Sequence, residues 1–374
     1  MSRSNKRIEK TDVVLLSTHK KLAAHELAIH QALGENIAGL LGASFCGMYD
    51  SAVHKGAGVY FIPSDTLIGR ENNSALGIES NDDFFGGMID LPFMATKAIS
   101  HPLLTNPTAQ PERWPELFFR RTEDAVLEGF TVFNSVDALR AGGLLLLHGA
   151  VRIKPVLATA GRGQIVVTSE AQLAAAIDEQ DMKEVALWGL TLEENLQDVV
   201  TYSVGQVQVA GITASYYGTQ SLTKDNRGET VYGGSALQLV RGGYPELLKL
   251  GLEEPVRRAV AQAMCYEKAA IMCFPEFIAS RRNYDIAQGR NARGQMCSGV
   301  LEQSWRIGGA SAAEVEALMA FAADTTLRRI RCSTHEIYGE ASLPIDAKVL
   351  YSGDDPEVGF ITKYTRADLH DRKQ

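Results

Sequence analysis

Residues 152–169 place a lysine and a glycine-rich run between two apolar stretches. Lys154 lies in the first stretch, and the run AGRGQ at 160–164 precedes the second. Glycines let backbone N–H groups approach phosphate oxygens closely, and a lysine adds a positive charge beside them. The run lacks the GxxxxGK[ST] pattern, and it lies between expected strands instead of opening a helix, which excludes a dinucleotide fingerprint. We therefore expect a phosphate-binding loop, with a hairpin turn beside an ordinary lysine as the alternative.

A second candidate is the polar sequence LEENL at 192–196, which ends an apolar strand. The carboxylates of Glu193 and Glu194, together with backbone groups of the turn, are suited to holding adenine or ribose hydroxyls. The alternative is a solvated acidic turn that binds nothing.

A third candidate joins NYDI at 283–286 to VLEQSWRIGG at 300–309, two expected strands connected by the turn GRNARG. This hairpin places Asp285 and Glu302 on neighbouring strands, and two carboxylates facing one side are hard oxygen ligands for Mg²⁺. Ser304 and Arg306 share the face of Glu302, because side chains two apart on a strand point the same way. Arg306 could neutralise a phosphate; alternatively, it pairs with one of the carboxylates and no metal binds.

The order of these features resembles the ATP-grasp superfamily over about residues 95–310. The resemblance implies a small leading α/β domain followed by an ATP-grasp fold of two α+β subdomains, with the nucleotide between them. It assigns nucleotide binding to Lys97, Lys154, Gly161, Arg162, Gly163, Gln164, Glu193, Glu194 and Leu196. It assigns metal binding to Asp285, Glu302 and Ser304, and catalytic roles to Lys154 and Arg306.

The sequence departs from the family pattern at Ser304, where the E-x-N-x-R strand carries a metal-binding asparagine. The resemblance implies two Mg²⁺ ions, so we expect the second to be held weakly, through water, or not at all. The interval between Asp285 and Glu302 is also longer than usual, which indicates an enlarged hairpin turn. The whole chain further resembles an uncharacterised bacterial family of ATP-grasp-like proteins of unknown function, which indicates no substrate.

The activity that the resemblance implies is ATP- and Mg²⁺-dependent ligation of a small carboxylate to an amine or another nucleophile, through an acyl-phosphate and ADP. One alternative is a nucleotide-binding regulatory protein that has lost turnover. The replacement of the metal-binding asparagine by Ser304 is the feature that supports this alternative. A carboxylase or kinase would share the same nucleotide contacts.

The elements that must position these residues follow from hydrophobic patterning. A strand at 13–16, a helix over 20–41 and a strand over 58–68 predict a parallel α/β unit. Residues 199–223 predict two antiparallel strands, and 257–273 a helix. Ser169 is a predicted N-cap with Gln172 at the capping-box position, and Ser311 is a second one with Glu314 three residues later.

We expect a leading domain at 1–95, an ATP-grasp domain at 96–345 with a lid subdomain at about 125–198, and a C-terminal extension at 346–374. The connector TNPTAQPERWP at 105–115 carries three prolines and marks a boundary or an exposed link.

Composition is that of a globular protein, with 45% hydrophobic and 22% charged residues. The net charge of −8 argues against nucleic acid as a partner. No signal peptide and no membrane span are evident. An odd number of cysteines without CxxC spacing disfavours disulfides and structural zinc. We therefore expect a cytoplasmic protein that binds no membrane, with a homo-oligomer and a monomer as the alternatives for its assembly.

Overall fold

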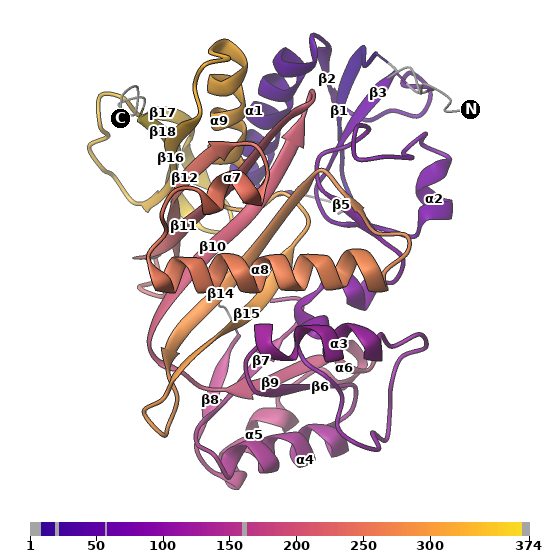
Figure 1. Cartoon of the computed structure of the whole chain (residues 1–374), viewed down its shortest axis with the longest axis vertical. Coiled ribbons are helices and arrows are strands. Elements are labelled where there is room, and N and C mark those ends of the chain that lie inside the picture. Colours follow the sequence, from indigo (N-terminus) through magenta and orange to yellow (C-terminus); the bar gives the residue numbers. More distant parts are fainter. Residues whose placement is uncertain (1–8, 19–21, 57, 159–162, 369–374) are drawn as a thin grey trace.

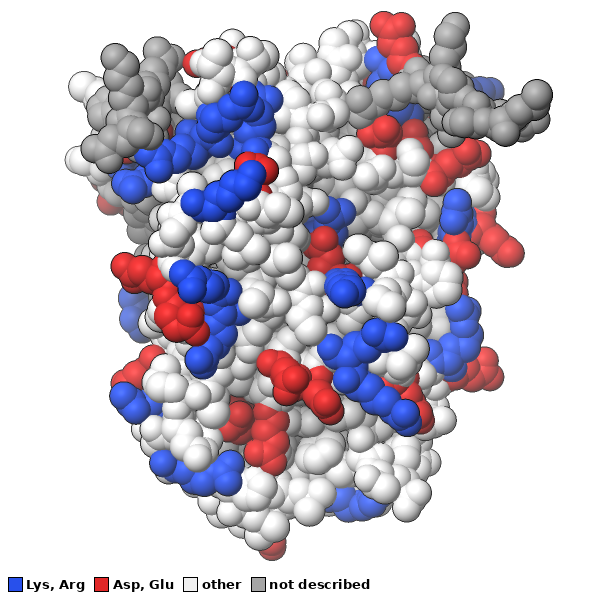
Figure 2. Space-filling view, viewed as in Figure 1, with Lys and Arg blue, Asp and Glu red and all other residues white. Residues whose placement is uncertain are grey.

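The computed structural model describes residues 9–18, 22–56, 58–158 and 163–368, and it has the mixed α/β and α+β architecture predicted from the sequence (Figure 1). Strands of the described residues form four sheets, one of eight strands and three smaller ones. No helix of the described residues is both long and apolar enough to cross a membrane. Figure 2 shows basic and acidic side chains interspersed on the face that carries α8.

The leading part is a parallel three-stranded sheet in the order β2-β1-β3. Its elements are β1 (Asp12–Leu16), α1 (Ala24–Leu41), β2 (Ser44–Met48) and β3 (Val59–Pro63). Parallel neighbours need a crossover, which α1 supplies between β1 and β2. The helix ends at Gly42, whose φ of 68° is a left-handed conformation that favours glycine. The predicted strand–helix–strand unit is confirmed.

A second small sheet links distant parts of the chain in the order β13-β5-β4. The strands are β4 (Leu67–Ile68), β5 (Gly87–Ile89) and β13 (Ile278–Ala279), and short helical turns surround them: α2 (Arg70–Ser74), η1 (Pro92–Ala95) and η2 (Lys97–Ser100). Because β13 directly precedes β14 of the large sheet, this pairing fixes the leading part against it.

A four-stranded antiparallel sheet in the order β6-β9-β7-β8 forms a separate core with three helices. Its elements are β6 (Gly129–Val132), α4 (Ser135–Leu146), β7 (Val151–Pro155), β8 (Ile165–Val167), α5 (Glu170–Asp178), α6 (Met182–Trp188) and β9 (Leu190–Glu194). The helices α3 (Glu116–Thr122) and η3 (Glu123–Ala125) precede it. Ser169 accepts from the N–H of Gln172, as predicted for the start of α5.

The large sheet is antiparallel throughout, in the order β15-β14-β10-β11-β12-β16-β18-β17. Its strands are β10 (Gln197–Val209), β11 (Ile212–Lys224), β12 (Thr230–Arg241), β14 (Arg281–Arg290), β15 (Met296–Ser304), β16 (Arg329–Tyr338), β17 (Lys348–Asp355) and β18 (Gly359–Asp368). The predicted strand pair at 199–223 and the predicted hairpin around GRNARG are both confirmed. The last two strands, from the C-terminal segment, complete one edge of this sheet.

Helices cover both faces of the large sheet. On one face α8 (Glu254–Cys273) packs on β10, β14 and β15, with α7 (Tyr244–Leu248) beside it. On the other face α9 (Ser311–Ala323) packs against β11, β16 and β18, and α1 packs against α9 and β17. The predicted capping box of α9 is wrong. Ala310 is the N-cap, and the Ser311 hydroxyl instead accepts from the N–H of Gly308 at 3.0 Å. Glu314 is fully buried and binds side chains of the sheet.

Candidate nucleotide and metal site

The two predicted metal-binding carboxylates lie directly opposite each other. Asp285 on β14 pairs in register with Glu302 on β15, so their side chains project from the same face of the sheet. Ser203 on β10 is the partner of Asp285 on its other side, and its hydroxyl donates to Asp285 Oδ1 at 3.5 Å. The Glu302 side chain is 32% exposed, so the pair is accessible from solvent.

The two carboxylates differ in charge balance. Burial and the neighbouring charge of Glu302 raise the pKa of Asp285 to about 7. Burial alone would also raise the pKa of Glu302, but Lys97, whose Nζ lies 2.9 Å from Glu302 Oε2, lowers it. A divalent cation between the two would relieve the repulsion at Asp285. The described residues hold no cluster of three or more His, Cys, Asp or Glu side chains, so any Mg²⁺ here would complete its shell with water or phosphate oxygens.

Lys97 connects the carboxylate pair to the segment that follows β7. It lies in η2 with only 5% of its side chain exposed, and its Nζ also donates to the carbonyl of Ala158 at 2.8 Å. The predicted glycine loop begins two residues after Ala158. The buried ammonium group of Lys97 thus contacts both the segment just before the glycine loop and one of the predicted metal ligands.

Lys154 and Glu193 form a buried ion pair together with a histidine that the sequence did not single out. Lys154 Nζ lies 3.0 Å from both Glu193 oxygens, and His101 Nε2 lies 3.0 Å from Glu193 Oε2. Burial opposes ionisation of Glu193, yet Lys154 and His101 lower its pKa to about 2. No described atom partners His101 Nδ1. It lies against Gly129, where a Cβ would come within 2.8 Å of it.

The predicted loop is only partly described. Gly161 and Arg162 lie outside the described residues. Gly163 has a φ of 66°, which favours glycine, and the Gln164 side chain accepts from Arg152 Nη1 at 3.0 Å. Arg152 Nη2 also donates to Asn195 Oδ1 at 2.7 Å, so one arginine ties the end of the loop to the segment linking β9 and β10.

The predicted adenosine-binding linker is shaped by an apolar patch. Leu196 is 6% exposed and packs with Leu127 and Ala287. Glu194 is partly exposed, and its Oε1 accepts from the N–H of Glu128 at 3.3 Å. The linker therefore combines a buried apolar residue with a partly exposed carboxylate.

Arg306 does not pair with either predicted metal ligand. Its Nε lies 3.6 Å from Asp65 Oδ1, in the turn after β3, and its Nη1 donates to the carbonyl of Ile307 at 3.0 Å. With a third of its side chain exposed, Arg306 stands between the leading part and the large sheet, near the carboxylates it was predicted to accompany.

Ser304 faces a buried guanidinium that sequence analysis did not predict. Arg281 Nη1 donates to the Ser304 hydroxyl and carbonyl, both at 3.1 Å, and to the carbonyl of Arg306. The Nε and Nη2 edge of Arg281 binds both oxygens of Glu314 at 2.8 Å. Glu314 also accepts from Tyr216 at 2.5 Å. Ser304 is thus fixed by a charge network that runs into α9.

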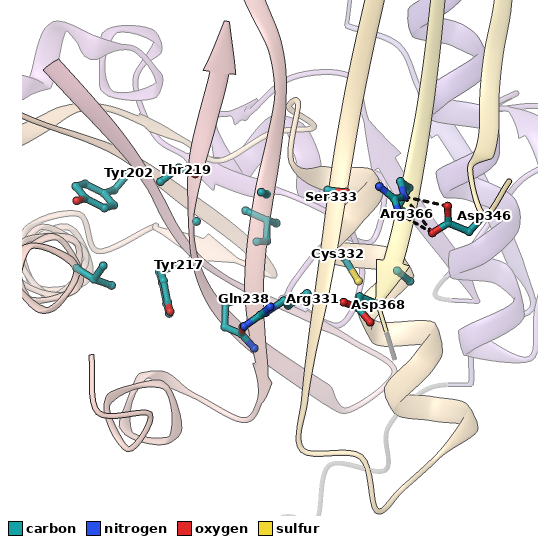
Figure 3. A pocket seen from close by; sticks show the side chains of 15 residues that line it. Tyr202, Tyr217, Thr219, Gln238, Arg331, Cys332, Ser333, Asp346, Arg366 and Asp368 are labelled. Atoms are coloured by element: carbon teal, nitrogen blue, oxygen red, sulfur yellow. Dashed lines mark hydrogen bonds and ion pairs between the residues drawn. The ribbon is translucent and has the colours of Figure 1, made fainter. Parts of the chain in front are cut away.

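A groove of about 830 Å³ lies on the opposite face of the large sheet (Figure 3). Tyr202 and Tyr217 line it, and Tyr202 is the chain neighbour of Ser203, which faces the carboxylates; adjacent strand residues point to opposite faces. The ion pair of Arg366 with Asp346, at 3.0 Å, borders the groove. This groove is therefore separate from the candidate site.

The chain belongs to the family described as protein of unknown function (DUF3182), whose family model matches residues 13–365. No curated protein sequence matches it.

Three solved structures share the fold of the chain at 12% sequence identity each. One is a biotin carboxylase–β,γ-ATP complex from Campylobacter jejuni, with a TM-score of 0.51, covering 95% of this chain and 87% of that one. Another is the biotin carboxylase domain dimer of the Hydrogenobacter thermophilus 2-oxoglutarate carboxylase with MgADP, ADP and bicarbonate, with a TM-score of 0.51 and coverage of 96% and 86%. The third is phosphoribosylamine–glycine ligase from Thermotoga maritima, with a TM-score of 0.50 and coverage of 95% and 92%. These are ATP-grasp proteins, so the resemblance to that superfamily is confirmed at the level of fold.

Proposed function

We propose that this member of the DUF3182 family is an ATP- and Mg²⁺-dependent ligase that joins a small carboxylate to an amine or another nucleophile. A carboxylate oxygen of the substrate attacks the γ-phosphorus of ATP, the bond to the β-phosphate oxygen breaks, and ADP leaves. The nucleophile then attacks the acyl carbon, phosphate leaves, and the nucleophile loses its proton. The fold's known members include ligases, which supports this class of reaction but not a particular substrate.

The observation that carries the proposal is the position of Lys97 between Ala158 and Glu302. Phosphoryl transfer asks the protein mainly to position charges around oxygens that gain charge in the transition state. Lys97 is a buried cation beside the carboxylate pair and next to the segment that leads into the glycine loop, so charges are already positioned before any ligand binds.

The proposed roles follow from what each group contacts. Asp285 and Glu302 would hold Mg²⁺, which neutralises phosphate charge when bound. Lys154 is held by Glu193 and would exchange that contact for phosphate oxygens. Arg306, partly exposed beside Asp65, would orient the acidic substrate or neutralise the acyl-phosphate.

We also propose the division that the sequence predicted, with the leading domain at 1–95 and the lid at about 125–198. The lid range contains the four-stranded sheet with its own core. The nucleotide would then lie between this sheet and the β14–β15 hairpin, with Glu193, Glu194 and Leu196 at the linker.

Trapping the activated carboxylate tests the reaction. The protein is incubated with Mg-ATP, pooled carboxylates and hydroxylamine, and ADP and hydroxamate are measured. We expect both products to form together, and Glu302→Gln to reduce them at least ~100-fold by removing a metal ligand. Glu316→Gln is the matched control, because Glu316 also pairs with a lysine, Lys348 at 2.9 Å, but lies on α9. AMP and pyrophosphate in place of ADP would contradict the reaction class.

The second candidate is a nucleotide-binding regulatory protein of the same fold. The contact of Ser304 with Arg281 favours it, since a position that holds a metal-binding asparagine in the superfamily is occupied in another way. This alternative predicts that ATP binds without ADP formation in any substrate mixture, and that Glu302→Gln changes no product yield.

A further inference from the structure

The environment of Ser304 differs sharply from that of the carboxylate pair, although both lie on the same face of β14 and β15. Asp285 faces Glu302, and the cross-strand partner of Ser304 is Asn283, two residues nearer to Arg281. Arg281 is 1% exposed and always protonated, so a fixed positive charge lies beneath this end of the hairpin.

Arg281 presents its positive edge to Ser304. Its Nε and Nη2 are engaged by Glu314 on one side, whereas Nη1 points at the Ser304 hydroxyl oxygen from 3.1 Å. The charge of Glu314 is therefore on the far side of the guanidinium from Ser304. The hydroxyl oxygen already accepts one hydrogen bond from a cation.

A Mg²⁺ ion on Ser304 would lie close to that cation. With a coordination bond of ~2.1 Å, the ion could stand no more than about 5 Å from Arg281 Nη1. At this separation, in a partly buried site, like charges repel strongly. Asp285 also lies within the field of Arg281, and Glu302 within that of Lys97, but each brings its own negative charge to offset the neighbouring cation, which the neutral hydroxyl of Ser304 does not. Lys97 pairs with one oxygen of Glu302 and leaves oxygens of both carboxylates for a metal.

Resting on the proposed function, we propose that the site takes one divalent cation, through Asp285 and Glu302, and that the guanidinium of Arg281 replaces the second cation of the superfamily at Ser304. Arg281 is a positioning residue, since it acts through its contacts with Ser304, Arg306 and Glu314. It also binds the backbone carbonyls of Ser304, at the end of β15, and of Arg306 just beyond it. The guanidinium that replaces the metal therefore also positions the arginine proposed to bind the substrate.

Counting Mn²⁺ ions tests this inference without relying on turnover. Mn²⁺ is titrated into equimolar protein and the non-hydrolysable analogue AMP-PNP, and unbound Mn²⁺ is read by electron paramagnetic resonance, with AMP-PNP alone as the baseline. We expect one Mn²⁺ per protein–nucleotide complex. Two bound ions would overturn the inference.

Variants separate the role of Ser304 from that of Arg281. Ser304→Asn restores the superfamily ligand but leaves the guanidinium, so the count should stay at one. Adding Arg281→Met and Glu314→Met replaces the buried ion pair by apolar side chains of similar size, a change that proteins often tolerate. This triple variant should bind a second Mn²⁺; a folded triple variant that holds only one would overturn the role of Arg281.

The number of Mn²⁺ ions bound by the wild type tests the inference even if the triple variant does not fold. Calorimetry with AMP-PNP then separates a failure of the proposed function from a failure of this inference. A protein that retains no AMP-PNP contradicts the proposed function and this inference with it, whereas one that retains AMP-PNP with two Mn²⁺ ions contradicts this inference alone.

Discussion

Asp285 lies directly opposite Glu302 on the β14–β15 hairpin, and Lys97 compensates the charge of Glu302 but not that of Asp285. Like charges opposite each other on neighbouring strands destabilise a sheet. The hairpin therefore carries an electrostatic cost in the absence of a metal, at the place where we propose that a metal binds. Proteins often retain such destabilising interactions at their functional sites, because the function needs them.

Asp285→Asn should stabilise the metal-free protein. The folded-state pKa of about 7 lies above the ordinary value of 3.8, so ionising Asp285 costs stability between these pH values, and the full cost is present at pH 8. We expect a gain of roughly 1–3 kcal/mol at pH 8 that vanishes near pH 4, measured by urea denaturation in EDTA.

Glu302→Gln is the informative contrast, because it removes the partner of the buried Lys97 and should lower stability under the same conditions. Asp285→Asn and Glu302→Gln thus have opposite signs. A loss of stability at pH 8 in both variants would show that repulsion at Asp285 is not the dominant effect.

Glu193→Gln should destabilise the protein in a pH-dependent way. Glu193 is ionised between Lys154 and His101, and its pKa falls from 4.5 to about 2 in the folded state. Its contribution is fully present above about pH 4.5 and is lost, at about 1.4 kcal/mol per pH unit, as pH falls toward 2. Urea denaturation should show a cost of about 3–5 kcal/mol at pH 7 that narrows below pH 4.5.

Glu246→Gln is the control for Glu193, because Glu246 pairs with Lys249 at 2.7 Å on the surface, where such pairs contribute little. A cost of Glu193→Gln that stays constant from pH 7 to pH 3 would mean that the carboxylate is not ionised in the fold.

Much of the fold was predictable because local patterning and long-range pairing agree. The apolar strands at 13–16 and 58–68 flank a helical segment, and residues 199–223 alternate as two strands. The structure contains both predicted units. The hairpin around GRNARG placed Asp285 and Glu302 on neighbouring strands, but their direct pairing was not predictable from the turn. The register next to the turn pairs Ile286 with Val300 and would put Leu301 opposite Asp285; a register shift between Asp285 and Ile286 brings Glu302 there instead.

The charge network of α9 was not predictable from spacing alone. Glu314 follows Ser311 by three residues, as in a capping box, but the loop at Gly308 takes the Ser311 hydroxyl and the helix begins after Ala310. Glu314 is then free to turn inward to Arg281, a residue 33 positions earlier. Only tertiary packing brings the two together, as it also does for His101 with Glu193.

The two interpretations of Glu314 predict different energies. A capping contribution would be lost at a cost of about 1 kcal/mol. Breaking the buried pair with Arg281 should cost about 3–5 kcal/mol, because it leaves a guanidinium without its carboxylate. Thermal or urea unfolding of Glu314→Gln decides between them, with Glu316→Gln as control, because Glu316 is only partly buried and pairs with the exposed Lys348. A loss of about 1 kcal/mol or less would restore the capping interpretation.

The central claim is that Mg²⁺ and a nucleotide bind together at Asp285 and Glu302, and isothermal titration calorimetry with AMP-PNP tests it most directly. In wild type and in Glu316→Gln, millimolar Mg²⁺ should tighten AMP-PNP binding at least ~10-fold, which corresponds to about 1.4 kcal/mol. In Glu302→Gln, Mg²⁺ should tighten it by less than ~3-fold. Equal Mg²⁺ dependence in all three proteins, or no binding of AMP-PNP to the wild type, would contradict the claim.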